Sequence, residues 1–301
     1  MYFTNLQFLR FPPTHDFSQL EQLLPEAALK PVGPLELSSR GFVSPFGRGE
    51  QALSHRIGQF VWLTVGAEER ILPSSVVNDM LAERIAEVEE KEGRKLGGKA
   101  RKRIKDDLLH ELLPRAFVKS SRVDALLDLD HGYLAVNTSS RKVAESVGSE
   151  IRRALGSFPA IPPNAELAPR SILTGWIAGE PLPEGLSLGA ECELKDAMDG
   201  GAVVKAQHQE LLSEEVAKLI ETGKQATKLA LVMEDRLSFV LGEDLVVRKL
   251  KFLEGAVDQL ERTDREDLRQ ELDARFALLS GEVRRLFLLL EAALKLSRAE
   301  P

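Results

Sequence analysis

The chain has 301 residues, of which 43% are apolar and 29% are charged, and its formal net charge at pH 7 is −7. This mixture of apolar and charged residues excludes a fully disordered chain, and no apolar run of about 18 residues offers a membrane-spanning helix. A single cysteine, Cys192, excludes an internal disulfide framework, and together with the lack of a secretory signal pattern it leads us to expect a cytoplasmic protein with no membrane partner.

The first elements of the chain mix strand and helix patterns. Residues 5–11 alternate like a strand, and residues 17–29 carry leucines at helical spacing. Residues 58–73 (GQFVWLTVGAEERILP) join β-forming apolar residues to a polar turn at Gly66–Glu69, so they predict a β-hairpin.

A helical period begins at Ser74. Apolar residues recur on one helical face up to the pair Gly97–Gly98, where the pattern is interrupted. The pattern resumes at Ala100 and ends at Pro114, because proline cannot continue a helix. The sequence therefore predicts a protruding helical hairpin over residues 74–113.

Strand and helix patterns continue to alternate over the rest of the chain. In order, the predicted elements are two strands within 115–138 around 128–132, a helix over 140–156, a proline-rich linker over 158–169, a short helix over 171–179, strands over 186–196 and 201–211 around a turn at Met198–Gly201, a helix over 213–223, and strands over 226–233, 236–242 and 245–252. A charged helical segment follows from Glu254 to the end. This order of elements is typical of an α+β protein.

We expect four parts in the chain. They are a first α+β domain over 1–73 plus 114–160, the helical hairpin over 74–113, a second α+β domain over 161–253, and a helical C-terminal segment over 254–301.

Positive charge is concentrated at the tip of the predicted hairpin. Residues 91–105 (KEGRKLGGKARKRIK) hold eight basic residues and one acid, Glu92, so this window carries +7 while the remaining 32 basic and 46 acidic residues sum to −14. Exposed lysines and arginines neutralise phosphates and release counterions, which favours nucleic-acid binding. The window has no aromatic residue to stack on bases, so such binding would not depend on base sequence. A solvated tip, or one that pairs with acids on a partner, explains the charge equally well.

Patterns typical of catalysis are missing. The sequence has no phosphate-binding glycine loop of the P-loop type and no dinucleotide fingerprint. The five histidines are scattered and no cysteine pair exists, so we expect no metal site, no cofactor and no catalytic residue. Cys192 lies between Glu191 and Glu193, and negative charge raises a thiol pKa, which disfavours a reactive thiolate.

Seven segments in chain order resemble the RdgC family of bacterial recombination-associated proteins. They are ILPSSVV (71–77), LLPRAF (112–117), LGSFP (155–159), LTGWI (173–177), TKLAL (227–231), RKLKF (248–252) and DREDLRQELDARFALLSGE (264–282). The resemblance implies a non-enzymatic homodimer closed into a ring with a positively charged hole. It also implies binding of single- and double-stranded DNA with little sequence preference, restraint of the RecA recombinase, and a cytoplasmic, nucleoid-associated location.

A ring of this kind needs cations only on its inner wall, while an acidic outer wall keeps it soluble. On the resemblance, the DNA-binding candidates are Lys99, Arg101, Lys102, Arg103, Lys105, Arg115, Lys119, Arg122, Lys205, Gln209, Lys224, Lys228, Lys249 and Lys251. If the strand after the hairpin is regular, Arg115 and Lys119 share one face and Arg122 has the opposite parity, unless the register changes near Ser120–Ser121. By the same parity, Lys249 and Lys251 project from one sheet face.

Phe117 allows two interpretations. It is either an apolar anchor at a subunit contact that closes the ring or an ordinary core aromatic residue. The chain as a whole also has alternatives: a protein–protein regulator or scaffold whose basic tip docks onto an acidic partner, and a metal-dependent nuclease built from some of the many carboxylates.

Overall fold

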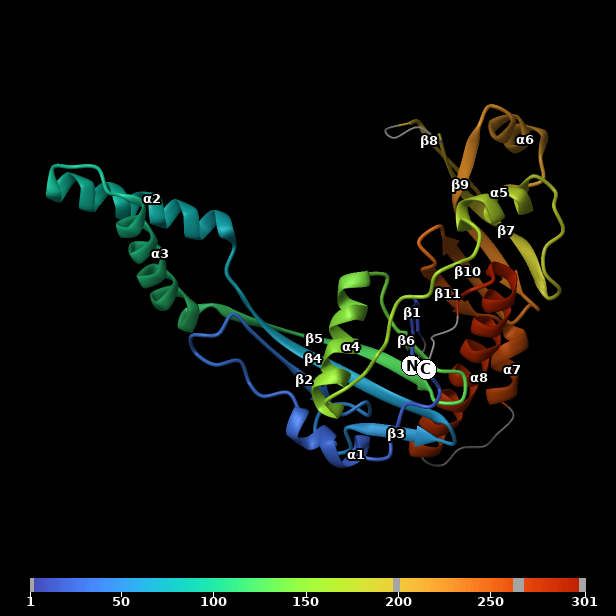
Figure 1. The fold of residues 1–301 in the computed structure, drawn as a ribbon, viewed down its shortest axis with the longest axis horizontal. Coiled ribbons are helices and arrows are strands. Elements are labelled where there is room, and N and C mark those ends of the chain that lie inside the picture. The colour runs from blue at the N-terminus through green and yellow to red at the C-terminus, as the bar shows by residue number, and fades with distance from the viewer. Residues whose placement is uncertain (1–2, 197–200, 262–267, 298–301) are drawn as a thin grey trace.

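The computed structural model describes residues 3–196, 201–261 and 268–297, and in these residues it contains two antiparallel sheets (Figure 1). The first sheet has the order β1 (Gln7–Arg10), β6 (Tyr133–Val136), β5 (Phe117–Asp128), β4 (Phe60–Ile71) and β2 (Ser38–Val43), with β3 (Ser54–Ile57) also paired to β4. The second has the order β11 (Val247–Phe252), β10 (Leu237–Gly242), β9 (Lys224–Met233), β7 (Leu186–Asp196) and β8 (Val203–Gln207). The predicted mixture of strands and helices is confirmed.

Helices cover both faces of the first sheet. On one face lie α1 (Leu20–Leu23), its 3₁₀ continuation η1 (Leu24–Ala27) and α4 (Arg141–Leu155), which share a core with strand residues such as Val61 and Leu127. On the other face lies α8 (Leu268–Leu294), where Phe276 stacks on Trp62 and Phe287 stacks on Tyr133. Because α8 shares this core with strand residues of the second sheet, it joins the two sheets.

The remaining helices lie at the ends of the molecule. α5 (Pro169–Ile177) and α6 (Glu214–Glu221) pack on β9, and α7 (Glu254–Glu261) packs on α8. α2 (Ser74–Glu92) and α3 (Gly98–Leu112) pack on each other, and a short 3₁₀ turn, η2 (Leu113–Arg115), leads from α3 into β5. None of the helices in the described residues is both long and apolar enough to cross a bilayer.

The predicted hairpin over residues 58–73 is wrong. Residues 60–71 form one continuous strand, β4, which pairs with β5 along its whole length. Gly66 sits inside the ladder opposite Gly41 of β2, and a Cβ at Gly66 would lie 2.7 Å from Cγ1 of Val43. This glycine therefore permits close packing and does not mark a turn.

The other predicted elements lie close to their expected places, including helices α2 to α6 and strands β5 to β11, whereas the sequence analysis does not predict β2 and β3. Met198 to Gly200 of the predicted turn and the first four residues of the segment 264–282 lie outside the described residues. The division into four parts stays a prediction.

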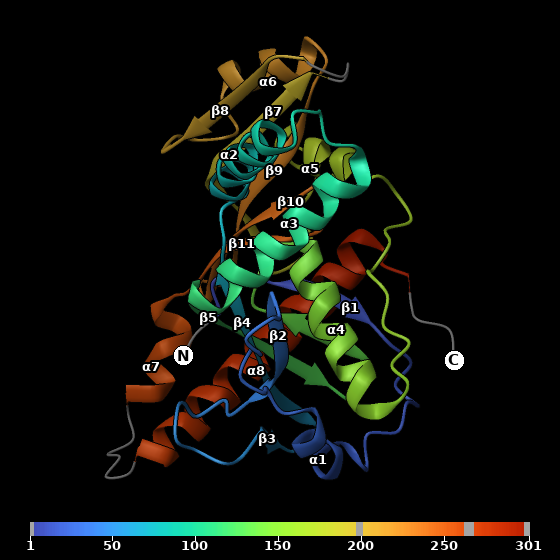
Figure 2. The ribbon, with the colours of Figure 1, turned by 90° about the vertical axis from the view of Figure 1, so that its left-hand side faces the viewer.

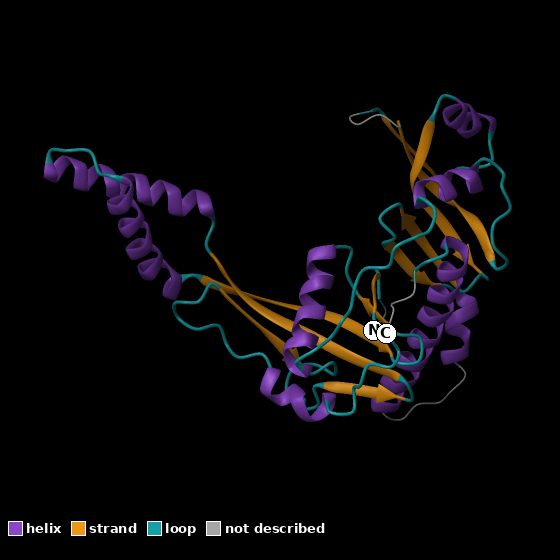
Figure 3. Ribbon diagram, in the orientation of Figure 1, coloured by secondary structure: helices purple, strands orange, loops and turns teal. Residues whose placement is uncertain are grey.

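The molecule has the outline of an open arch (Figures 1 and 3). β4 and β5 form a long twisted ribbon that carries α2 and α3 away from the first sheet, and the second sheet with α5 and α6 rises at the opposite end. Figure 2 views the arch from the side of α2 and α3, with the second sheet beyond them.

Candidate nucleic-acid interface

The basic segment surrounds the connection between α2 and α3. Gly93 ends α2 in the left-handed conformation, with φ of 67°, where glycine carries no Cβ penalty. Glu89 accepts a hydrogen bond from the Leu96 amide at 2.8 Å, and this bond is the main reason that the pKa of Glu89 lies below its ordinary value. The connection is thus fixed by local hydrogen bonds, and the cations project from it.

The cations of this segment divide into two groups. Arg101 pairs with Glu89 and Arg94 pairs with Glu92, both at 3.0 Å, so these charges are partly neutralised within the hairpin. The other candidates of the segment are exposed on α3 and form no ion pair with any residue that the structure describes; they are Lys99, Lys102, Arg103 and Lys105. These four are available to an external anion.

Three further candidates lie in β5 or just before it, and strand parity is confirmed for Lys119 and Arg122 but does not apply to Arg115. Arg115 lies in η2 and not in the strand, because Pro114 favours the helical φ there. The β4–β5 ladder has no register shift, so Lys119 and Arg122 face opposite sides of the ribbon. All three are exposed, and Arg122 donates to the carbonyl of Ser44.

Phe117 is not a core residue, since 84% of it is exposed. It pairs across the ribbon with Ile71, which is also exposed. Other exposed apolar side chains lie at the same outer end of the ribbon, and we term this set the distal patch: Leu37, Ile71, Val76, Phe117 and Val118. Phe117 and Ile71 share one face of the ribbon, whereas Val118 faces the other side, so the patch spans both faces. Exposed apolar side chains at one end of a molecule are typical of a protein contact surface.

The second sheet places most of its candidates on the face opposite the core, which we term the open face. Cys192 and Leu194 of β7 are buried, and side chains alternate along a strand, so Glu191 and Glu193 point to the open face. Glu193 accepts from Lys228 of β9 at 3.0 Å and lies 3.5 Å from Lys205 of β8.

Two more candidates of this sheet are also paired. Lys249 of β11 donates to Glu191 at 2.6 Å on the open face. Lys224 lies 3.8 Å from Asp196, and by strand alternation it is on the same side of the sheet as the buried Ala226. Lys251 is exposed and forms no ion pair with a described residue, and Gln209 is half-buried after β8. In contrast to the hairpin, therefore, this face has most of its cations neutralised by its own acids.

Lys249 and Lys251 line one shallow depression of about 240 Å³ on the open face. A β-bulge in β11, where Lys249 has a φ of 53°, changes the strand period between Arg248 and Lys251. The two lysines thus share a side as predicted, although the bulge breaks the regular strand on which that prediction rested.

Cys192 is buried beneath this face. Burial raises the pKa of its thiol, and the neighbouring Glu191 carboxylate raises it further. The expectation of an unreactive thiol is supported by this environment.

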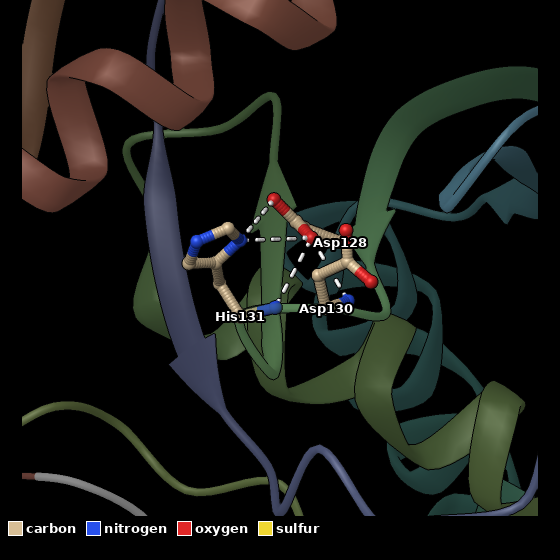
Figure 4. A group of neighbouring side chains, drawn as sticks. All are labelled: Asp128, Asp130 and His131. Atoms are coloured by element: carbon tan, nitrogen blue, oxygen red, sulfur yellow. Dashed lines mark hydrogen bonds and ion pairs between the residues drawn. The ribbon is translucent and has the colours of Figure 1, made fainter.

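One cluster of possible metal ligands escaped the sequence analysis, although its signal, the run DLDH at 128–131, was present. Among the described residues, Asp128, Asp130 and His131 place one ligand atom each within 4.8 Å of the others (Figure 4). However, Arg284 of α8 donates from Nε and Nη2 to the Asp128 carboxylate at 2.6 and 2.8 Å. Its guanidinium also lies 4.1 Å from the centre of the Phe60 ring. The cluster thus binds a cation that the chain itself supplies, and it ties the β5–β6 turn to α8.

Comparison with known proteins gives consistent matches over the whole chain. A family model described as "Putative exonuclease, RdgC" matches residues 1–297. Proteins named recombination-associated protein RdgC are 72% identical in Xanthomonas campestris pv. campestris (strain B100), 71% in Xanthomonas axonopodis pv. citri (strain 306) and 67% in Stenotrophomonas maltophilia (strain R551-3). Each of these matches covers 100% of both chains.

Proposed function

The chain belongs to the RdgC family of recombination-associated proteins, and on that premise we propose that it binds single- and double-stranded DNA without reading base sequence. In this proposal two copies close into a ring around the DNA, and the work of the protein is electrostatic and steric. It acts without a cofactor, in the nucleoid.

One observation carries the DNA-binding proposal. Four exposed cations of α3 remain unpaired among the described residues, in a chain whose net charge is −7. Phosphate oxygens are the partners that such lysines and arginines bind through charge-assisted hydrogen bonds. Unpaired cations at one tip contribute no ion pair to the stability of this acidic protein, so we attribute to them the binding of an external anion.

The outline of the chain supports the homodimer. A single copy is an open arch with the exposed distal patch at the end of its ribbon. A two-fold contact brings the same patch of two copies together, and a second contact at the other end closes the ring. A protein that encloses DNA in this way occupies the strand on which the RecA recombinase must assemble, so it limits RecA loading by exclusion.

The test of this function is a salt titration of DNA binding. We expect K99A/K102A/R103A/K105A to bind a labelled random-sequence duplex more weakly at low salt, and to flatten the slope of log Kobs against log salt by about 2 to 4, since each phosphate contact contributes about 0.9. Fluorescence anisotropy at several salt concentrations measures both quantities.

The matched control removes four exposed basic residues from other elements, K30A/K218A/R285A/K295A, and should change the slope much less. Equal slopes for the two variants would contradict a role for the tip. If the unmodified protein binds no DNA but its basic tip captures an acidic protein, the scaffold alternative takes its place.

Exonuclease activity is a second candidate, because the description of the matching family names it. The cluster that resembles a metal site, Asp128 with Asp130 and His131, is engaged by Arg284, which favours a structural role. The test incubates labelled duplex and single strands with the protein and Mg²⁺. Release of nucleotides that is lost in D130N, whose side chain is 45% exposed, would replace the non-enzymatic proposal.

A further inference from the structure

On the open face of the second sheet, one carboxylate lies between two lysines and interacts with both. In the antiparallel ladders, Glu193 of β7 stands opposite Lys205 of β8 on one side and opposite Lys228 of β9 on the other. Glu193 accepts from Lys228 through both carboxylate oxygens at 3.0 Å, and Lys205 lies 3.5 Å away. One acid therefore neutralises much of the charge of two candidate DNA contacts.

A second carboxylate binds a lysine across the depression. β7 and β11 are separated by β9 and β10 in the sheet, yet Lys249 donates to both oxygens of Glu191 at 2.6 and 2.7 Å. Next to this pair, Gly189 lets β7 approach β9 closely, since a Cβ at Gly189 would lie 2.8 Å from the Cβ of Ala230. Glu191 and Lys249 both line the depression, so this ion pair crosses it.

The packing of the sheet does not need these pairs. Its apolar core lies on the other face, where Cys192, Leu194 and Leu229 are buried. The side chains of Lys205 and Lys249 are more than half exposed, so each lysine is solvated readily if its acid is removed. Glu193 is only 19% exposed and also accepts from the hydroxyl of the buried Thr227 at 3.0 Å. A glutamine at position 193 keeps an oxygen that can accept this bond, so the loss of negative charge acts mainly on the field outside the sheet.

We propose that Glu191 and Glu193 are internal competitors of the DNA phosphates, which weaken DNA binding by holding three lysines of the open face. This inference rests on the proposed function. A phosphate that approaches this face must displace a carboxylate from its lysine, and the freed carboxylate then repels the phosphate and takes up a cation from solution. The two acids thus set both the affinity and its salt dependence, and they keep the protein from holding DNA too tightly to release it.

The test neutralises the two acids without changing their shape. In E191Q/E193Q we expect about tenfold tighter binding of a labelled random-sequence duplex at low salt, and a slope of log Kobs against log salt that is steeper by about 1 to 2 per chain. The control E21Q/E26Q adds the same charge on α1 and η1, at the lower edge of the arch in Figure 1, and should change neither value by more than about twofold. Thermal unfolding verifies that each variant is folded.

The separate variants E191Q and E193Q apply if the double variant does not fold. A double-mutant cycle tests the link to one lysine: E191Q should tighten binding in the unmodified chain and have no effect in the K249A background. Equal tightening in E21Q/E26Q would show that net charge alone acts, and unchanged or weaker binding in E191Q/E193Q would show that the acids do not compete. Either result overturns the inference and leaves the proposed DNA-binding function intact. If the unmodified protein binds no DNA, the inference and the proposed function are both overturned.

Discussion

At the scale of single residues, an ion pair between an acid and a base contributes differently to stability according to how deeply it is buried. Asp128 is fully buried, and it accepts from Arg284 and from the backbone amides of Asp130 and His131. Its partner Arg284 comes from α8, so this ion pair holds two distant parts of the chain together. The pairs on the open face of the second sheet involve lysines that are more than half exposed, so they contribute less to stability than the buried pair does.

The first prediction follows from this contrast. D128N should lower the free energy of unfolding by about 3 kcal/mol, because it leaves the guanidinium of Arg284 without its buried counter-charge. Asp130 lies 3.3 Å from the same guanidinium but is 45% exposed, so D130N should cost less than about 1 kcal/mol. Urea unfolding followed by circular dichroism measures the free energy of unfolding of both variants. Equal losses of stability would contradict the role of the Asp128–Arg284 ion pair in holding the β5–β6 turn to α8.

At the scale of elements, the β4–β5 ribbon is the feature that positions the candidate site. Its twelve paired residues extend from the covered sheet to the exposed hairpin, and burial changes along it from Ala125, which is buried, to Phe117, which is exposed. Within this ribbon, Gly66 lets two side chains pack closely against β4: Val43 of β2 and Leu29, which follows η1. The orientation of α2 and α3 therefore depends on packing that is distant from their own sequences.

This packing predicts opposite effects for two glycine substitutions. G66A should destabilise the protein by about 1 to 3 kcal/mol, since the new Cβ would lie 2.7 Å from Val43 and 2.9 Å from Leu29. G281A should stabilise it by about 0.5 to 1 kcal/mol, because Gly281 lies within α8 and a Cβ there meets no other heavy atom within 4 Å. Urea denaturation at equilibrium measures both, and a neutral G66A would contradict the close-packing account of β4.

At the scale of the whole molecule, charge and apolar surface are separated within the arch. Four unpaired cations lie on α3, the distal patch lies where the hairpin joins the ribbon, and most of the cations on the open face of the second sheet are neutralised. Under the proposed ring, the distal patch contacts a second copy while both sets of cations face the DNA. In that ring, DNA binding depends on the subunit contact, because only the closed dimer encloses the DNA.

That dependence gives the final prediction. F117S should convert the dimer to a monomer at micromolar concentration, because burial of a phenylalanine contributes about 1.5 to 3 kcal/mol and a two-fold contact uses each residue twice. DNA affinity should fall with it, since an open arch does not enclose the duplex. Sedimentation at several concentrations reports the mass, and L167S, at an exposed leucine outside the distal patch, serves as the control. A dimeric F117S would place the subunit contact elsewhere.

The sequence by itself determined the features that depend on neighbouring residues in the chain: the positions of helices and strands and the local concentration of charge. The helical period and the glycine pair located α2 and α3, the alternation of residues 186–196 located β7, and the charge of residues 91–105 marked the basic tip. Only the tertiary structure decided which cations are free. Glu193 neutralises Lys228 and Arg284 binds Asp128 because strand pairing and helix packing bring together residues that are far apart in the chain. The same holds for Gly66 and Phe117, whose roles depend on the neighbours that the fold provides or withholds, and no periodicity in the sequence records those neighbours.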